Sequence, residues 1–539
     1  MASEHSHTCD STGLTGGACC NAAGLRAFYE RAARGMVSRR HVMAGLGTAA
    51  VGAWVLTSRR AKAEAGAAST PPTITPAKEL IIQPVLTYAI PKRAEQTSWR
   101  PWGGLMEPSD VDEEAKRITS ELGELASNTG LAVKFLPVMP VDDRAKAERA
   151  AKAVCDVTLI YASGGDGDVL EKLVVPDRPT IFFLRHRSGP VSLWYEIMHP
   201  RFLRKTTDEY KQPGVDVGDV VVDDRDDLAW RLRGLLGLRR TLGQKVVTIG
   251  GAAGWGVGGQ IAPKIAKTVW KLELPDVSYE TLSQRIRKIK DDSHAVTEAG
   301  RKAEEYLKDS GVELFTEKKY VANAFLLARL FKDLMAEQSA TAITVNHCMG
   351  TIMPMSETTA CLTLSLLNDE GYLAFCESDF VVIPSGILMH HITGTPVFLN
   401  DPTWPHHGVV TVAHCTAPRK MNGERLEPVK IHTHFESDYG AAPKVEMAEG
   451  QRITMAVPDF ACQKWVGFTG RIEANPFHAI CRAQMDVTID GNWPKLVDEM
   501  RGFHWMMVYG DCAREIGYAI KHLGIKWLNV SAEPTPGVA

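Results

Sequence analysis

The chain has 539 residues, of which 45% are hydrophobic and 23% charged, and its 61 Lys and Arg side chains nearly balance 64 Asp and Glu side chains. This composition excludes an intrinsically disordered chain, a collagen-like repeat and a small disulfide-stapled scaffold. At roughly 150 residues per domain the length predicts about two to four domains, and a net charge of −3 argues against a nucleic-acid partner.

The first 63 residues differ in charge from the rest of the chain. They carry eight Lys or Arg and three Asp or Glu, so they hold +5 and the remainder holds −8. Arg39 and Arg40 precede an apolar run, residues 42–56, whose 15 residues fall short of the roughly 20 that span a membrane. The small-x-small sequence at 61–63 follows. This order predicts a twin-arginine export signal.

We therefore expect a signal peptide over residues 1–63 and a mature protein in the periplasm or the extracellular space, with no membrane span after cleavage. A basic surface helix with a chance arginine pair is the alternative interpretation. Arg59 and Arg60, which follow the apolar run, also leave open an uncleaved anchor. The twin-arginine route carries folded proteins, so it is compatible with a cofactor that is bound before export.

Eight of the 11 cysteines follow the predicted signal. None of them forms a CxxC pair, which argues against a zinc finger or a redox motif. Most lie in apolar contexts, where cysteine serves as a small core residue. An oxidising compartment permits disulfides, and the spacing leaves their pairing open.

A linker, residues 64–78, precedes the first predicted globular domain, residues 79–240. Strand-like and helix-like segments alternate there, with strands expected at 80–85, 131–138, 157–161 and 180–184 and helices at 110–128 and 144–153. Short apolar runs of this kind suit strands that are buried on both faces of a parallel sheet. The alternation predicts an α/β domain.

A second α/β domain is predicted over residues 241–395. It begins with a strand at 245–249 and continues through a long polar helical stretch at 279–310, a helix at 323–337 and strands at 342–345 and 372–375. Residues 396–530 have short strand-like pieces separated by Pro, Gly and Asp, and a helix at 512–523 closes them, before a tail at 531–539. The predicted fold is thus two Rossmann-like α/β domains followed by a β-rich C-terminal domain.

A glycine-rich run, residues 250–259, follows the first strand of the second domain. Such a run can cradle a phosphate at a helix N-terminus. It lacks, however, a clean GxGxxG with an acidic residue about 20 positions downstream. We interpret it as a strand-to-helix turn at a sheet crevice, and an exported oxidoreductase that binds a dinucleotide there remains an alternative.

Acidic and histidine side chains gather in residues 357–415. Glu377, Asp401 and His414 each follow a predicted strand, and His504 lies far downstream. Carboxylates and imidazoles at strand ends suit a hard or borderline divalent ion, and loops after buried strands form the ligand-binding edge of an α/β sheet. Neighbouring residues are expected to cap, pack, face solvent or line a secondary pocket: Asp379, His390, His391, Trp404, His406 and His407.

Several short segments resemble motifs of the L-fucose isomerases and the related L-arabinose isomerases. Residues 377–379 (ESD) resemble the TEND segment, residues 392–395 (ITGT) the LTGT segment, and residues 398–401 (FLND) the F-A-D segment. Residues 503–510 resemble the NH…TYG segment, and residues 412–415 (VAHC) resemble GAH. The motifs cover roughly residues 340–530, and the loop after Asp401 departs from the family pattern.

The resemblance implies a metal-dependent aldose–ketose isomerase that acts on a monosaccharide through an enediolate. It assigns Glu377, Asp401 and His504 as ligands of Mn²⁺ or another divalent ion, with Glu377 and Asp401 also moving protons. It makes His414 a further metal ligand or a substrate contact, and it implies a homo-oligomer, a trimer or hexamer. An exported carbohydrate-binding protein on the same scaffold, without turnover, is the alternative from another functional class.

Overall fold

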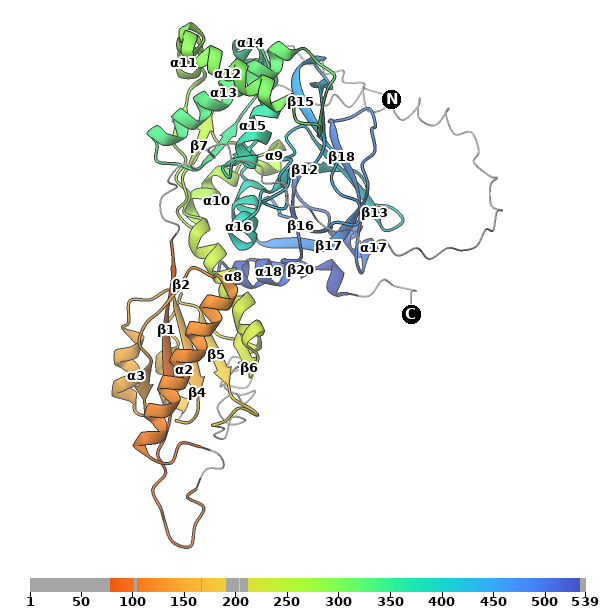
Figure 1. Cartoon of the computed structure of the whole chain (residues 1–539). Coiled ribbons are helices and arrows are strands. Elements are labelled where there is room, and N and C mark those ends of the chain that lie inside the picture. Colours follow the sequence, from red (N-terminus) through yellow and green to blue (C-terminus); the bar gives the residue numbers. More distant parts are fainter. Residues whose placement is uncertain (1–77, 101–103, 166, 191–202, 204–211, 534–539) are drawn as a thin grey trace, which may run out of the picture. The chain divides into compact units, whose positions relative to one another are not determined.

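The computed structural model describes residues 78–100, 104–165, 167–190, 203 and 212–533, all within one unit, Thr70–Ala539. The predicted signal peptide, most of the linker and the end of the predicted tail lie outside the described residues. The chain is an α/β protein with two parallel sheets, followed by an antiparallel β-barrel of six strands (Figure 1). Within the described ranges, no helix combines the length and apolarity needed to cross a membrane.

The first sheet is parallel and has the strand order β2 (Val133–Phe135), β1 (Leu80–Thr87), β4 (Val157–Ala162), β5 (Thr180–Leu184) and β6 (Val220–Val222). A further strand, β3 (Met139–Val141), also pairs with β1. The strand expected at 131–138 is present but shorter, because β2 ends at Phe135 and β3 is a separate strand. β2 and β3 pair with opposite ends of β1, and Pro137 between them has no N–H to donate to a continuous ladder.

Helices cover both faces of this sheet: α2 (Pro108–Thr129), α3 (Arg144–Ala151), α4 (Gly167–Leu173) and α8 (Arg225–Thr241), with the 3₁₀ turn η1 (Val217–Asp219) before β6. Side chains that alternate along β4 enter two different cores. Leu159 packs with α2 and α8 residues, and Ile160 packs with α3 and α4 residues. The two-sided burial explains why these strands are continuous apolar runs.

The second sheet is also parallel, in the order β11 (Leu373–Phe375), β10 (Ala342–Val345), β7 (Val246–Ile249) and β8 (Asp276–Val277). Its helical segments are α9 (Gly256–Gly259), α10 (Ala262–Thr268), α11 (Tyr279–Asp291), α12 (Ser293–Tyr306), α13 (Lys318–Glu337), η2 (Cys348–Ile352), α14 (Met353–Ser356), α15 (Ala360–Asp369) and α16 (Ile383–Thr393).

The helical stretch expected at 279–310 is two helices, α11 and α12. Asp292 ends the first helix and caps the second, because its side chain accepts hydrogen bonds from the backbone N–H groups of His294 and Ala295. An aspartate at an N-cap competes in this way with continuous helix.

The barrel has the strand order β16 (Arg452–Val457), β19 (Trp505–Tyr509), β12 (Phe398–Pro402), β13 (Val409–His414), β18 (Ala483–Thr488) and β17 (Lys464–Ala474), and pairing of β16 with β17 closes it. β20 (Lys526–Asn529) adds to β17, and β9 (Val312–Leu314), β14 (Val429–His434) and β15 (Tyr439–Val445) form a separate small sheet. The remaining elements are α17 (Trp493–Glu499), α18 (Ala513–Lys521) and η3 (Val530–Ala532).

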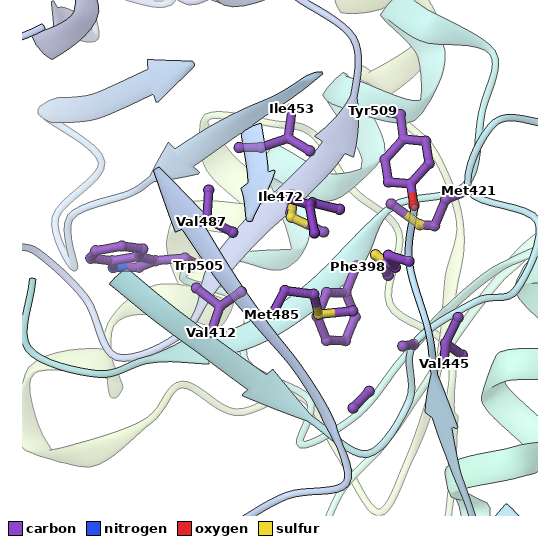
Figure 2. Close-up of a cluster of buried hydrophobic side chains, with 14 of the residues drawn as sticks. Phe398, Val412, Met421, Val445, Ile453, Ile472, Met485, Val487, Trp505 and Tyr509 are labelled. Atoms are coloured by element: carbon purple, nitrogen blue, oxygen red, sulfur yellow. The ribbon is translucent and has the colours of Figure 1, made fainter. Parts of the chain in front are cut away.

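Alternation along the barrel strands divides their side chains between two cores. Phe398, Trp505 and Met507 belong to the core that Figure 2 shows, together with Val412 and Met485. Met506 and Val508 pack instead with buried residues of α16 and the second sheet. Strands β12 and β19 therefore pack one face against the interior of the barrel and the other against α16 and the second sheet.

Helix α8 packs closely on two helices outside the first sheet. An added Cβ at Gly234 would lie 2.8 Å from the backbone oxygen of Glu515 in α18, and one at Gly237 would lie 2.4 Å from Cγ1 of Ile392 in α16. Both positions therefore need glycine, because a side chain would push the helices apart.

Candidate functional site

Glu377, Ser378 and Asp379 form a tight loop directly after β11, at the carboxyl edge of the second sheet. Glu377 and Ser378 adopt left-handed backbone, with φ of 63° and 49°. This conformation is uncommon for residues other than glycine and costs about 1–3 kcal/mol. Strain of this kind persists only where surrounding contacts hold the backbone in place.

The glycine-rich run holds this loop. The backbone N–H of Ala253 donates to the oxygen of Ser378, and the oxygen of Ala253 accepts from the N–H of Phe380. The N–H of Trp255 donates to Oδ1 of Asp379 at 3.3 Å. A Cβ at Gly254 would lie 2.0 Å from the oxygen of Gly259, so the run must be small to fold against itself. Its observed role is to support residues 377–379.

The barrel supplies three more site residues by strand register. β12 pairs antiparallel with β19, with Leu399 opposite Met506 and Asn400 opposite Trp505, so the next position brings Asp401 beside His504. β13 pairs with the other side of β12, with Ala413 opposite Asp401, and His414 is the last residue of β13. Asp401 thus lies within β12, and His414 within β13, rather than after these strands as expected.

The four residues predicted from the sequence converge. His504 Nε2 lies 3.3 Å from Glu377 Oε2 and 3.3 Å from Asp401 Oδ1, and His414 Nε2 lies 3.7 Å from Glu377 Oε1. Ligand atoms of Asp401, His414 and His504 all lie within 4.8 Å of one another, as do those of Cys376, Glu377 and His414. We call Glu377, Asp401, His414 and His504 the carboxylate–imidazole site.

Partners on their far sides orient both imidazoles. His504 Nδ1 lies 2.8 Å from Asp379 Oδ2, and both side chains are buried. His414 Nδ1 lies 3.1 Å from the hydroxyl of Thr416. A histidine that binds a metal ordinarily donates its other ring N–H to a carboxylate or similar oxygen, which turns the free nitrogen toward the ion. In both residues Nε2 is the nitrogen left to face the carboxylates.

Asp379 is the residue that sequence reasoning missed, because it was expected only to cap or pack. It does cap: its Oδ1 accepts from the N–H of Val381. Its other oxygen contacts His504, which lies 125 positions away. The resemblance of residues 377–379 (ESD) to the TEND segment was the available signal, but it could not reveal this contact.

The site is strongly electrostatically coupled. Burial disfavours a charge on Glu377, but His414 and His504 outweigh it and hold the pKa of that carboxyl far below its usual value. Burial also disfavours a charge on His504, yet Asp379, Glu377 and Asp401 raise its pKa well above the usual value. Burial raises the pKa of Asp401 despite the two imidazoles. The carboxylates therefore favour a positive charge at this position.

The donor set fits a divalent ion. Asp401 Oδ1 and His504 Nε2 are buried, and neither has a hydrogen-bond partner among the described residues. Ligand atoms about 2.1 Å from an octahedral ion lie roughly 3 Å apart, close to the distances observed here. Carboxylate oxygens with imidazole nitrogens suit Mn²⁺ or a similar ion. The Glu377 and Asp401 side chains are 38% and 32% exposed, so the site is open to a small molecule.

Other histidines of the 357–415 stretch have separate partners. His390 Nδ1 contacts the backbone oxygen of Thr395, and His391 Nε2 contacts Oε1 of Gln244. His406 contacts the backbone oxygen of Trp404, whose side chain is 67% exposed, in the loop between β12 and β13. The structure brings none of these three histidines into the cluster of metal-type ligands found among the described residues.

Comparison with known proteins adds no family assignment. No protein-family model matches the chain, and no curated protein matches it. Function must therefore be argued from the site itself.

Proposed function

We propose that this protein is a metal-dependent aldose–ketose sugar isomerase that uses Mn²⁺ or a similar divalent ion. The observation that carries the proposal is the convergence of two carboxylates and two oriented imidazoles. Among the described residues, Asp401 Oδ1 and His504 Nε2 are buried there without a hydrogen-bond partner. The resemblance to the L-fucose isomerases also points to Glu377, Asp401 and His504, and the resemblance to the related L-arabinose isomerases adds His414.

Aldose–ketose isomerisation moves one proton between C1 and C2 of the sugar and another between O1 and O2. A bound divalent ion would polarise the two sugar oxygens. Glu377 and Asp401 would exchange the roles of base and acid, and both side chains are partly exposed. Their pKa values are pushed in opposite directions, a pattern that separates acid from base. His414 and His504, fixed by Thr416 and Asp379, would hold the ion.

Three further elements belong to the proposal. The two parallel α/β units correspond to Rossmann-like domains, with predicted limits at 79–240 and 241–395 and a β-rich domain at 396–530. The protein would be exported by the twin-arginine route and cleaved after Ala63, which N-terminal sequencing of secreted protein would test. It would form a homo-oligomer, a trimer or hexamer by the resemblance, which light scattering would test.

The direct test of the reaction is proton exchange. Mn²⁺-loaded protein would be incubated with a panel of aldoses and ketoses in D₂O and followed by NMR. We expect one sugar pair to interconvert and to take up deuterium at C1 or C2, because the transferred proton passes through a carboxylate. Glu377→Gln should abolish the exchange, whereas His406→Gln, in the exposed loop, should not.

The outcome also decides the alternative function. A sugar that binds, by calorimetry, without interconversion or deuterium uptake would favour the exported carbohydrate-binding protein. Nicotinamide or flavin absorbance in the purified protein would instead favour the oxidoreductase interpretation of residues 250–259.

A further inference from the structure

A second group of metal-type ligands lies beside the carboxylate–imidazole site and is chemically different from it. Cys361, Cys415 and His434 are all buried, and one ligand atom of each lies within 4.8 Å of the other two. Cys361 and Cys415 pack together in one small buried cluster, and Cys481 packs against it. We call Cys361, Cys415, His434 and Cys481 the cysteine–histidine cluster.

The members of this cluster come from separate elements. Cys361 is the second residue of α15, Cys415 follows β13, His434 ends β14, and Cys481 precedes β18. These positions are spread over 120 residues, so no short CxxC spacing announces them. A bound ion would tie the helical layer, the barrel and the small sheet together at one point.

The pKa values of the Cys361, Cys415 and Cys481 thiols are raised, with burial among the causes, so these thiols hold their protons until an ion displaces them. Burial lowers the pKa of His434 to about 4, which keeps its imidazole neutral. Cys361 lies in the first turn of α15, where the helix dipole stabilises negative charge. The hydroxyl of Ser437 lies 3.3 Å from His434 Nδ1, which leaves Nε2 for a metal and fixes the ring.

We propose that Cys361, Cys415 and His434, with Cys481 as the fourth donor, form a structural zinc site separate from the catalytic one. Thiolates with one imidazole are a common ligand set of structural Zn²⁺, whereas the carboxylate–imidazole site suits a harder ion. Tetrahedral Zn²⁺ with bonds of about 2.3 Å to sulfur places its sulfur atoms roughly 3.8 Å apart. The ligand atoms of Cys361, Cys415 and His434 all lie within 4.8 Å of one another, which is compatible with that spacing. Binding releases the thiol protons.

This proposal does not rest on the isomerase proposal, because the two sites use different residues. Its test is Co²⁺ substitution of the full chain, since Co²⁺ bound to thiolates shows a near-ultraviolet charge-transfer band that Co²⁺ bound to oxygen and nitrogen lacks. We expect the band in the unmodified protein and in Glu377→Gln. We expect its loss in Cys415→Ser and at least a tenfold weaker Co²⁺ affinity in His434→Gln. Cys155→Ser, outside the cluster, is the matched control.

A second measurement needs no substitution and so does not depend on the folding of a variant. Thiols of the unmodified protein would be alkylated with and without Zn²⁺ and located by peptide mass mapping. Zinc should protect Cys361, Cys415 and Cys481 and leave Cys155 reactive. The proposal would be overturned if the protein, purified without reductant, has a mass lower by two hydrogens and carries Cys415 in a disulfide. A missing charge-transfer band or a band lost in Glu377→Gln would overturn it too.

Discussion

The carboxylate–imidazole site has two sides that the chain builds differently. On the loop side, residues 377–379 hold Glu377 in left-handed backbone, and the glycine-rich run braces that backbone. On the barrel side, Asp401, His414 and His504 come from the register of β13, β12 and β19. The barrel side therefore follows from regular strand pairing, whereas the loop side stores backbone strain at Glu377 and Ser378.

This difference assigns separate tasks to the two sides. Regular strands fix ligand positions at little conformational cost, which suits the imidazoles and Asp401. A strained loop can aim a carboxylate where no regular element would place it, and such strain concentrates at functional sites. Relief of the loop strain should therefore raise stability while it lowers turnover, and substitutions of the imidazoles or of the residues that orient them should mainly lower metal affinity. Asp379, although it lies in the loop, belongs to the second group because it orients His504.

The largest effect is expected for Glu377→Gln on the loop side. Loss of the carboxylate removes both a ligand and a proton-transfer group, so turnover should fall by about 10³-fold or more. Steady-state kinetics with the sugar identified in D₂O measures this loss. Circular dichroism should remain unchanged, and isomerisation at the unmodified rate would contradict the role of Glu377.

The next effect concerns the support of His504. Asp379→Asn removes the charge that orients this imidazole, so Mn²⁺ affinity should fall by about 10–100-fold. Thr416→Val removes the hydroxyl that contacts His414 on the barrel side, and it should lower Mn²⁺ affinity by a smaller factor. Calorimetric titration of the two variants compares them, and a larger loss in Thr416→Val would reverse the ranking.

As pH rises, the stability of the ion-free protein should fall, whereas its affinity for Mn²⁺ should rise. In the ion-free protein the pKa of His504 is raised, so the stability from its imidazolium is present below about pH 6.5, the unfolded value, and is lost as pH rises through the folded-state pKa. A metal binds the neutral imidazole of His504. Mn²⁺ affinity should therefore rise by up to about tenfold per pH unit as the pH rises toward the folded-state pKa of His504.

Calorimetry across this pH range, with denaturation of the ion-free protein alongside, measures both slopes. Asp379→Asn should flatten the affinity slope, because it lowers the pKa of His504. An affinity that does not change with pH in the unmodified protein would contradict the ligand role of His504.

The smallest effect is a gain in stability. Ser378 adopts a φ of 49°, and its buried hydroxyl has no hydrogen-bond partner among the described residues. Ser378→Gly removes both the left-handed strain and the buried hydroxyl, so the free energy of unfolding should rise by about 1 kcal/mol. Turnover should fall, because the more flexible backbone holds Glu377 less firmly. Ala413→Gly, in regular strand β13, is the matched control and should only destabilise. A destabilised Ser378→Gly would contradict the stored strain.

The sequence predicted the scaffold and the four residues of the carboxylate–imidazole site better than the residues that support them. Apolar runs identified the parallel strands, and residues at or near strand ends identified Glu377, Asp401 and His414. Asp379 was missed because its contact with His504 spans 125 positions. The left-handed backbone of Glu377 was invisible because no glycine marks it, and the cysteine–histidine cluster was invisible because its members come from four separate segments. Each failure concerns a contact that only the folded chain creates.

The most direct test of the central claim is to locate the ion. Crystals of the mature protein soaked in Mn²⁺ would be measured on both sides of the manganese absorption edge. We expect an anomalous difference peak bounded by Glu377, Asp401, His414 and His504, which disappears in Asp401→Asn. No peak at these four side chains, or a peak that persists unchanged in that variant, would contradict that claim.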